Sequence, residues 1–543
     1  MDPRLRERRR YRNALHYRGV AGLSMADIAA AAQAWARALA AHGITRIFGV
    51  PGGGPNLMMV GAAEELGIDF TLMHAETPAC ITAGVFGRAT GTCGVVVVTR
   101  GPGLTSAING IASATLDRLP LAVFSDTVAL DQADRIAHQR LDQPEVSGPV
   151  TKWSGVLGST ETEERAGAAI AVAMAQPPGA VHLDFDPSHP GSAAPAQSAS
   201  DHPGTTLPLE LISTAQRPVV IVGTRIDSSY PELAQALDQC RAPILATYHA
   251  KGSINEGAHP SFVGMFTGVT ADHALLEAAD LIVCIGVDTV EPMPGDWPHG
   301  SKTVLVNPHA METTYFAAAT EITGSLDRLG AQALGALTSQ WEWNSVSTPR
   351  KALQALAETD RLTPLTAVVD SKAAIPNAAI CIDAGAHMLA VMQLWPIDSP
   401  AKCAISNGLA TMGFALPAAI GLALAHPTER IVCHVGDGGL MMCLGELETI
   451  TRLNLNVTVL VYNDSSLSLI KLKQRENQGG SQAVDYSTVD FAQLASAMQI
   501  PGFVVETREA LRSTLARDPQ GPVVVDMRLD YRDYPAIMRA ARG

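Results

Sequence analysis

The stretch from Ile431 to Gln474 constrains the fold of this chain more than any other part of the sequence. It contains two apolar runs separated by a glycine-rich turn and a helical pattern, in the order Ile431–Val435, Gly436-Asp437-Gly438-Gly439, Leu440–Arg452 and Val457–Tyr462. Short, continuous apolar runs predict buried parallel strands, and a helix between two such strands predicts a βαβ unit. In a right-handed unit of this kind, both strands end at the same edge of the sheet.

Two acidic residues follow these strands. Asp437 stands in the glycine-rich turn and Asp464 comes after the second strand, so the shared sheet edge brings them together although 27 positions separate them. Glycines let backbone amides approach a ligand closely, and amides at the start of a helix suit phosphate. Oxygen side chains suit Mg²⁺. The stretch therefore predicts a site for a metal ion and a diphosphate, whereas a glycine-rich turn alone would equally fit a tight corner.

The rest of the chain continues the alternation of short strands and helices from Met25 onward. Further strands are predicted at Ile44–Val50, Phe70–His74, Val95–Thr99, Leu121–Ser125, Pro218–Val222, Pro243–Thr247, Leu281–Gly286 and Thr303–Val306. This repetition predicts an α/β fold built from doubly wound parallel sheets. A length of 543 residues suits about three such domains.

Changes in composition place the predicted domain limits. We expect a disordered basic tail at 1–24 and three domains, at 25–190, 209–340 and 352–543. The first linker, at 191–208, is rich in Ser, Ala, Pro and Gly, and a second linker is expected around Trp341–Pro349. The Gly101-Pro102-Gly103 turn of the first domain resembles the glycine-rich turn of the third. Two related layers are therefore expected around a different central domain.

Composition also limits the kinds of partner and the cellular location that we expect for this protein. A formal net charge of −14 argues against nucleic acid or an anionic membrane surface as a partner, and no run is long and apolar enough to span a bilayer. The eight cysteines form no CxxC pair, which predicts buried free thiols and a cytoplasmic location. Seven arginines precede Gly19 without an apolar core, so this segment is not a secretory signal. A basic interaction arm is the less favoured interpretation.

Three stretches resemble the thiamine diphosphate (ThDP) enzymes of the acetolactate synthase and benzoylformate decarboxylase type. They are HAETPACITAGVFGRATG with the GPG turn that follows it, NGLATMGFALPAAIGLALA at Asn407–Ala425, and the GDG turn followed by Asn463-Asp464. The resemblance covers the chain from Met25 to Gly543. It implies a pyrimidine-binding, a central and a diphosphate-binding domain, in this order.

The resemblance assigns Glu76 as the catalytic glutamate, which hydrogen-bonds the aminopyrimidine ring of ThDP and promotes loss of the C2 proton. A pKa raised by desolvation would suit this role. The alternative interpretation is a carboxylate that merely stabilises the start of a helix. Met412 matches the bulky apolar residue that forces the cofactor into a bent shape.

The resemblance also assigns the cofactor's anchors. Mg²⁺ is expected on Asp437, Asp464 and the backbone carbonyl of Ser466. The diphosphate is expected on the glycine-rich turn and on a second turn, formed by Gly385, Ala386 and His387. The chain departs from the family at Asp464, where an asparagine is usual, and at Ala386, where a glutamine is frequent. The extra carboxylate favours the cation but repels diphosphate, and we expect binding to survive.

Gly53 and Gln139 match positions that line the reacting centre of acetolactate synthases. His138 stands where those enzymes usually have phenylalanine, and Lys473 stands where they usually have tryptophan. Both changes make the predicted pocket more polar. Lys473 is expected to face an anionic substrate group, and the alternative is an ordinary solvated lysine.

The resemblance implies ThDP- and Mg²⁺-dependent decarboxylation of a 2-oxo acid such as pyruvate, followed by carboligation. A non-oxidative decarboxylase that releases an aldehyde, a catalytically silent ThDP-binding protein and a nucleotide-binding oxidoreductase are the alternatives. Gly286–Gly300 lacks the Arg-Phe-Asp-Asp stretch of flavin-containing relatives, so FAD is the less favoured cofactor. The family builds each active site from two subunits, which implies a homodimer or homotetramer.

Overall fold

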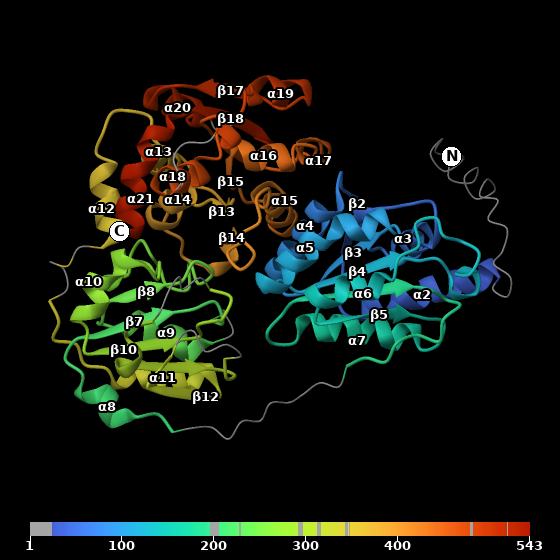
Figure 1. Cartoon of the computed structure of the whole chain (residues 1–543), viewed down its shortest axis with the longest axis horizontal. Helices are drawn as coiled ribbons and strands as arrows, with labels where there is room; N and C mark the ends of the chain where they lie inside the picture. Colours follow the sequence, from blue (N-terminus) through green and yellow to red (C-terminus); the bar gives the residue numbers. More distant parts are fainter. Residues whose placement is uncertain are drawn as a thin grey trace.

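The computed structural model describes residues 24–195, 206–226, 230–291, 297–311, 317–342, 346, 348–477, 482–517 and 520–543. The predicted basic tail lies outside this part of the chain except for Ser24, and so does most of the predicted linker at 191–208. The described residues form three α/β bodies, each built on a six-stranded parallel sheet (Figure 1). The prediction of three doubly wound parallel-sheet domains is confirmed, and the domain limits stay predictions.

The first sheet has the strand order β2-β1-β3-β4-β6-β5. Its strands are β1 (Arg46–Val50), β2 (Asp69–Leu72), β3 (Gly94–Val98), β4 (Leu121–Asp126), β5 (Trp153–Leu157) and β6 (Ala180–Phe185). Its helices are α2 (Met25–Ala41), α3 (Pro55–Glu65), α4 (Glu76–Thr90), α5 (Pro102–Leu116), α6 (Gln143–Ser147) and α7 (Thr162–Met174). The helix α2 starts with a capping box between Ser24 and Asp27. It buries Trp35 and Leu39 against one face of the sheet.

The central sheet has the order β12-β11-β10-β7-β8-β9. Its strands are β7 (Pro218–Val222), β8 (Ile244–Ala246), β9 (Phe262–Met265), β10 (Leu281–Ile285), β11 (Thr303–Asn307) and β12 (Thr320–Thr323). The main helices around it are α8 (Leu209–Thr214), α9 (Pro231–Gln239), α10 (Thr270–Ala278) and α11 (Leu326–Ala336). This order differs from that of the first sheet, in agreement with a distinct central domain.

The third sheet has the order β14-β13-β15-β16-β18-β17. Its strands are β13 (Ala379–Ile382), β14 (Cys403–Ile405), β15 (Ile431–Gly436), β16 (Val457–Asn463), β17 (Gly502–Val505) and β18 (Val523–Arg528). Its helices are α12 (Pro349–Leu356), α13 (Pro364–Ala374), α14 (Met388–Leu394), α15 (Ala415–Ala425), α16 (Asp437–Met442), α17 (Glu446–Arg452), α18 (Ser468–Asn477), α19 (Phe491–Ala497), α20 (Arg508–Leu515) and α21 (Tyr534–Arg542). Counted along each domain, its strands follow the same order as those of the first sheet.

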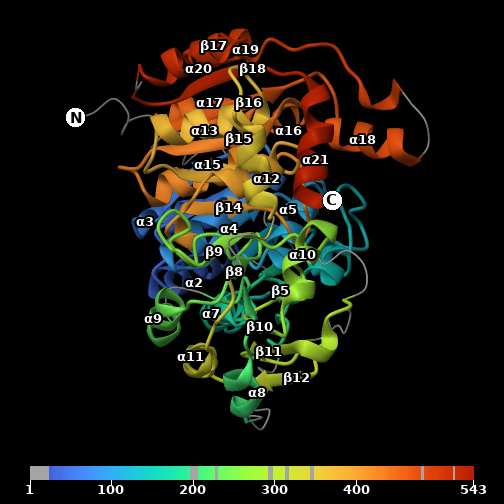
Figure 2. The same cartoon turned by 90° about the vertical axis from the view of Figure 1, so that its left-hand side faces the viewer.

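The third domain lies against both other domains (Figure 2). Alternate residues of β15 point to opposite faces of the sheet, as the two-residue period of a strand requires. Ile431 and Cys433 join a core that includes α4 of the first domain and α15, whereas Val432 joins a core shared with the central domain. The third sheet is therefore covered by buried apolar side chains on both faces, which explains the continuous apolar runs in its sequence.

One predicted element is wrong. The helix expected over Leu440–Arg452 is split into α16 and α17. A Cβ atom added to Gly445, in the break, would lie 3.1 Å from the Cβ of His74 in the first domain. The backbone N–H of His74 also donates a hydrogen bond of 3.0 Å to Glu446 Oε1. The break therefore lets the first domain approach the third, a contact that the local pattern could not reveal.

Each strand predicted from the sequence is present, with small shifts at the ends. The eight cysteines are free and buried, as predicted. Within the described ranges, no helix is long and apolar enough to cross a membrane.

Candidate active site

A cavity of about 370 Å³ opens at the carboxyl edge of the third sheet. It lies where the segments after β13 and β15 meet, the point at which the strand order reverses and where open α/β sheets bind ligands. The predicted cofactor residues that line it are Gly385, Ala386, His387, Met412, Gly436, Asp437, Gly438, Gly439, Asp464, Ser466 and Lys473. The fold thus gathers residues from four separate segments into one hollow.

Asp437 is the first residue of α16 and is 3% exposed. Its Oδ1 accepts hydrogen bonds from Gly438 N at 2.8 Å and from the Tyr486 hydroxyl at 2.7 Å, and its Oδ2 accepts one from Ser465 N at 2.7 Å. Burial raises the pKa of Asp437, and these donors act against the rise. The donors fix the direction of the carboxylate at the cavity wall.

Asp464 follows β16 and accepts a hydrogen bond of 2.6 Å from the Ser468 hydroxyl. Burial raises the pKa of Asp464 to about 7, and the negative charge of Asp437 adds to the rise. A divalent cation near both carboxylates would offset this repulsion. Within the described residues, no cluster of three or more His, Cys, Asp or Glu side chains could hold a metal by itself. A cation here would need further oxygens, from a backbone carbonyl, water or a bound diphosphate.

His387 supplies an unsatisfied polar atom at the same cavity. The residue is 2% exposed, and its ring stacks on Tyr462 with 4.7 Å between ring centroids. No described residue hydrogen-bonds to its Nε2. Burial lowers the pKa of His387 to about 4, so the ring is neutral near pH 7. A buried nitrogen without a partner is costly, and a ligand oxygen in the cavity would satisfy it.

The glycine-rich turn packs closely against its neighbours at the cavity wall. A Cβ atom added to Gly438 would lie 3.0 Å from the Tyr486 hydroxyl oxygen and 3.5 Å from Met412 Cε. The predicted apolar residue and the predicted diphosphate turn therefore meet at one point of the cavity. The two carboxylates, the unsatisfied imidazole nitrogen and this turn fit a diphosphate and its cation.

The sequence interpretation missed Asp383 and Tyr486. Asp383 is fully buried and accepts hydrogen bonds from Ala384 N at 2.9 Å, Gly413 N at 3.0 Å and Phe414 N at 3.2 Å. It thereby ties the end of β13 to the segment that carries Met412. Its position directly after an apolar run was a signal for a strand-end site, whereas nothing local to Tyr486 indicates its contact with Asp437.

The other predicted site residues lie on the first domain. Glu76 starts α4 after β2, Gly53 follows β1, and Gln139 touches the Gly101 turn after β3. Since β1 pairs with both β2 and β3 in parallel, these residues lie at one edge of the first sheet. Burial raises the pKa of Glu76. None of the three is among the described residues lining the cavity, so a single chain does not join the two halves of the predicted site.

Asp288, which follows β10, ties the central domain to the first. It is fully buried and accepts hydrogen bonds of 2.8 Å from Arg118 Nη2 and 3.1 Å from Arg225 Nε. These two arginines hold the pKa of Asp288 below its usual range despite its burial. The stretch considered for FAD lies partly outside the described residues, at 292–296.

Three α/β domains and a strand-edge cavity suited to a diphosphate and a cation define a cofactor-dependent α/β enzyme. Comparison with known proteins makes the class specific. Residues 29–146 match the family described as thiamine pyrophosphate enzyme, N-terminal TPP binding domain. Residues 208–334 match the central domain of the same family, and residues 383–527 match its C-terminal TPP binding domain.

Known proteins are similar in sequence to this chain over most of its length. The catabolic acetolactate synthase of Raoultella terrigena is 30% identical over 541 residues, which cover 92% of this chain and 95% of the relative. The acetolactate synthase of Bacillus subtilis (strain 168) is 28% identical, with 91% and 92% covered. The acetolactate synthase isozyme 3 large subunit of Escherichia coli (strain K12) is 29% identical, with 88% and 90% covered.

The chain belongs to the thiamine pyrophosphate enzyme family, and within it to the acetolactate synthase-like enzymes that act on 2-oxo acids. Thiamine pyrophosphate is ThDP, so the cofactor predicted from the sequence is confirmed.

Proposed function

We propose that this protein uses ThDP and Mg²⁺ to decarboxylate a 2-oxo acid of the pyruvate type and to join the product to a second 2-oxo acid. The observation that carries the proposal is the cavity at the third sheet edge, which is lined by two carboxylates from neighbouring strands and by a histidine with an unsatisfied buried imidazole nitrogen. The extended similarity to acetolactate synthases supports carboligation over simple decarboxylation.

The chain's own residues divide the binding work. Asp437, Asp464 and the carbonyl of Ser466 would hold Mg²⁺, while His387 and the amides of the two glycine-containing turns would hold the diphosphate. Met412 would support the bent shape of the cofactor from its position beside Gly438. When bound, ThDP supplies a carbon nucleophile that attacks the 2-oxo group.

Glu76 would hold a proton at the pyrimidine ring of the cofactor. Its raised pKa supports such a role, because a carboxyl group exchanges a proton best when its pKa is close to the working pH. Glu76 does not line the cavity of its own chain. We therefore place the Glu76 edge of one subunit against the cavity of another, in a homodimer or a homotetramer made of such dimers.

Gly53, Gln139 and Lys473 would form the substrate pocket. A Cβ atom added to Gly53 would meet no atom within 4 Å, so this position offers open space beside the reacting centre. Lys473 is exposed and lines the cavity, which suits a contact with the carboxylate of a 2-oxo acid. The eight buried free thiols support a reducing compartment, and we place the protein in the cytoplasm.

The test is product analysis after incubation of the purified protein with pyruvate, ThDP and MgCl₂. We expect 2-acetolactate as the main product, with none formed when EDTA replaces MgCl₂. Acetaldehyde as the sole product would replace the carboligase assignment by a decarboxylase. Bound ThDP without turnover of any of a panel of 2-oxo acids would replace it by a catalytically silent protein.

A further inference from the structure

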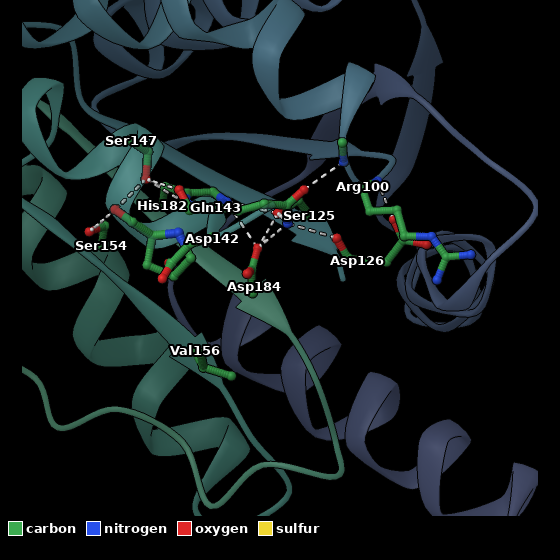
Figure 3. Close-up of polar contacts among 12 residues, drawn as sticks. Arg100, Ser125, Asp126, Asp142, Gln143, Ser147, Ser154, Val156, His182 and Asp184 are labelled. Atoms are coloured by element: carbon green, nitrogen blue, oxygen red, sulfur yellow. Dashed lines mark hydrogen bonds and ion pairs between the residues drawn. The ribbon is translucent and has the colours of Figure 1, made fainter. Parts of the chain in front are cut away.

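A buried network of polar side chains lies under the carboxyl edge of the first sheet (Figure 3). Its members come from β4, α6 and β6 and are at most 3% exposed: Ser125, Asp126, Gln143, Ser147, His182 and Asp184. Burying so many polar groups is costly unless each is hydrogen-bonded. The residues assigned above to the active site do not include any member of this network.

Gln143 is the centre of the network, because its side-chain amide connects three neighbouring strand ends. Its Nε2 donates to Asp184 Oδ1 on β6 at 2.5 Å and to the backbone oxygen of Asp126, the last residue of β4, at 3.0 Å. Its Oε1 accepts a hydrogen bond of 2.6 Å from the backbone N–H of Gly101, which follows β3. One side chain thus fixes the relative positions of all three ends.

The direction of every bond follows from Asp184. An ionised carboxylate only accepts hydrogen bonds, so the amide nitrogen of Gln143 must face Asp184 and its oxygen must face Gly101. Ser125 Oγ likewise donates to Asp184 Oδ1 at 2.7 Å and therefore accepts from His182 Nε2 at 2.7 Å. His182 Nδ1 is then free to accept from Ser147 Oγ at 2.8 Å. One arrangement of protons satisfies all of these bonds.

The Gly101 turn connects the buried network to Gln139 in the predicted substrate pocket. Gly101 has a φ of 66°, and a Cβ atom added to it would lie 3.0 Å from both the Cβ and the backbone oxygen of Gln139. Gln139 itself has a φ of 57°, which is uncommon for a residue other than glycine. The turn and Gln139 therefore pack in direct contact, and displacement of one displaces the other.

We propose that Gln143 is a positioning residue for the substrate pocket, which it orders by holding the Gly101 turn against Gln139. The inference rests on the proposed function, since it assumes that Gln139 faces the substrate. Gln143 itself is buried and would touch neither substrate nor cofactor.

A double-mutant cycle tests the connection to Gln139. Gln143→Met keeps the length of the side chain but removes its hydrogen bonds, and we expect it to lower kcat/KM for pyruvate by about tenfold. In a Gln139→Ala background the same change should cost less than about threefold, because the residue that it positions is already gone. The loss of Tm should be the same in both backgrounds. Equal losses of kcat/KM in both backgrounds would overturn the proposal.

Hydrogen exchange measured by mass spectrometry gives a readout that needs no turnover. Gln143→Met should speed exchange in the peptides that contain Gly101 and Gln139. The matched control is Ser147→Ala, which shortens the far end of the same network without touching Gly101. Unchanged exchange of the Gly101 peptide in Gln143→Met would refute the proposal. Because this arm is independent of pyruvate turnover, it separates a wrong positioning role from a wrong proposed function.

Discussion

The first and third sheets have the same strand order, but the side chains at their carboxyl edges are arranged differently. In both sheets the strand order reverses at the same place, between β1 and β3 and between β13 and β15. At the edge of the first sheet, the hydrogen bonds of Gln143 join the ends of β3, β4 and β6, whereas the edge of the third sheet opens into a cavity of about 370 Å³. The shared topology thus selects where a site can form, and the side chains at the edge decide what it can hold.

The contrast is sharpest at one pair of corresponding carboxylates. Asp184 on β6 accepts from the amide of Gln143 at 2.5 Å, and Asp526 on β18 accepts from the amide of Asn463 at 2.8 Å. In the first sheet, the side-chain oxygen of Gln143 accepts a hydrogen bond from the backbone N–H of Gly101. In the third sheet, the side-chain oxygen of Asn463 has no partner among the described residues. The first edge is satisfied internally, and the third edge keeps polar atoms unused.

The largest effect is expected from Asp437→Ala, which removes one of the two carboxylates at the third edge. Turnover of pyruvate should fall by at least about 1000-fold, because the remaining carboxylate cannot hold the cation and position the diphosphate. Steady-state kinetics at saturating Mg²⁺ measure the loss. Asp184→Asn, at the first edge, is the control and should retain ThDP binding. Similar loss of ThDP binding in both variants would remove the functional distinction between the edges.

The next effect concerns Glu76 at the first edge. Glu76→Gln keeps the size of the side chain but cannot exchange a proton, so turnover should fall by about 100-fold. The variant should still bind ThDP with reduced affinity, because residues of the third sheet edge hold the diphosphate and its cation. Deuterium exchange at C2 of bound ThDP measures the chemical defect, and calorimetry measures binding. Normal exchange in the variant would remove Glu76 from this role.

A pair of glycine substitutions compares the packing of the two edges. A Cβ atom at Gly439 would overlap Asp383 Oδ2, whereas one at Gly53 meets nothing within 4 Å. Gly439→Ala should therefore lower the free energy of unfolding by about 3 kcal/mol, and Gly53→Ala should change it by less than about 0.5 kcal/mol. Denaturant unfolding without cofactor measures both. Equal decreases in the free energy of unfolding would show that Gly53 has no more space around it than Gly439.

The smallest effect is a pH dependence at the third edge. Burial lowers the pKa of His387 to about 4, so the folded protein binds fewer protons there than the unfolded chain below about pH 6.5. The stability that comes from the neutral ring is full above that pH and is lost as the pH falls towards 4. At pH 5 the loss should be about 2 kcal/mol. In His387→Gln, the decrease in stability from pH 7 to pH 5 should be smaller by this amount; an unchanged decrease would show that His387 titrates normally.

These regions also show how far the sequence could predict the molecule. The strands were predictable because buried runs such as Ile431–Val435 are bounded by turns. Asp437 and Asp464 were predictable because each follows an apolar run, whereas Met412, His387 and Lys473 were assigned through the resemblance to ThDP enzymes. The break at Gly445 was not predictable, because its cause is His74 of another domain.

Contacts between distant parts of the chain also explain why Tyr486 and Gln143 were not predicted from the sequence. Tyr486 reaches Asp437 across 49 positions, and Gln143 meets Asp184 across 41. No local pattern specifies such contacts, since they depend on how strands and loops are brought together in space. The fold class was thus readable from local periodicity, whereas the hydrogen bonds that order the two edges were not.

The most direct test of the distinction between the edges is calorimetric titration of the protein with ThDP, in MgCl₂ and in EDTA. We predict Mg²⁺-dependent binding of one ThDP per subunit, abolished by Asp437→Ala and retained in Asp184→Asn. Binding that is equally tight in EDTA, or that survives Asp437→Ala unchanged, would contradict the assignment of the third sheet edge as the site of the diphosphate and its cation.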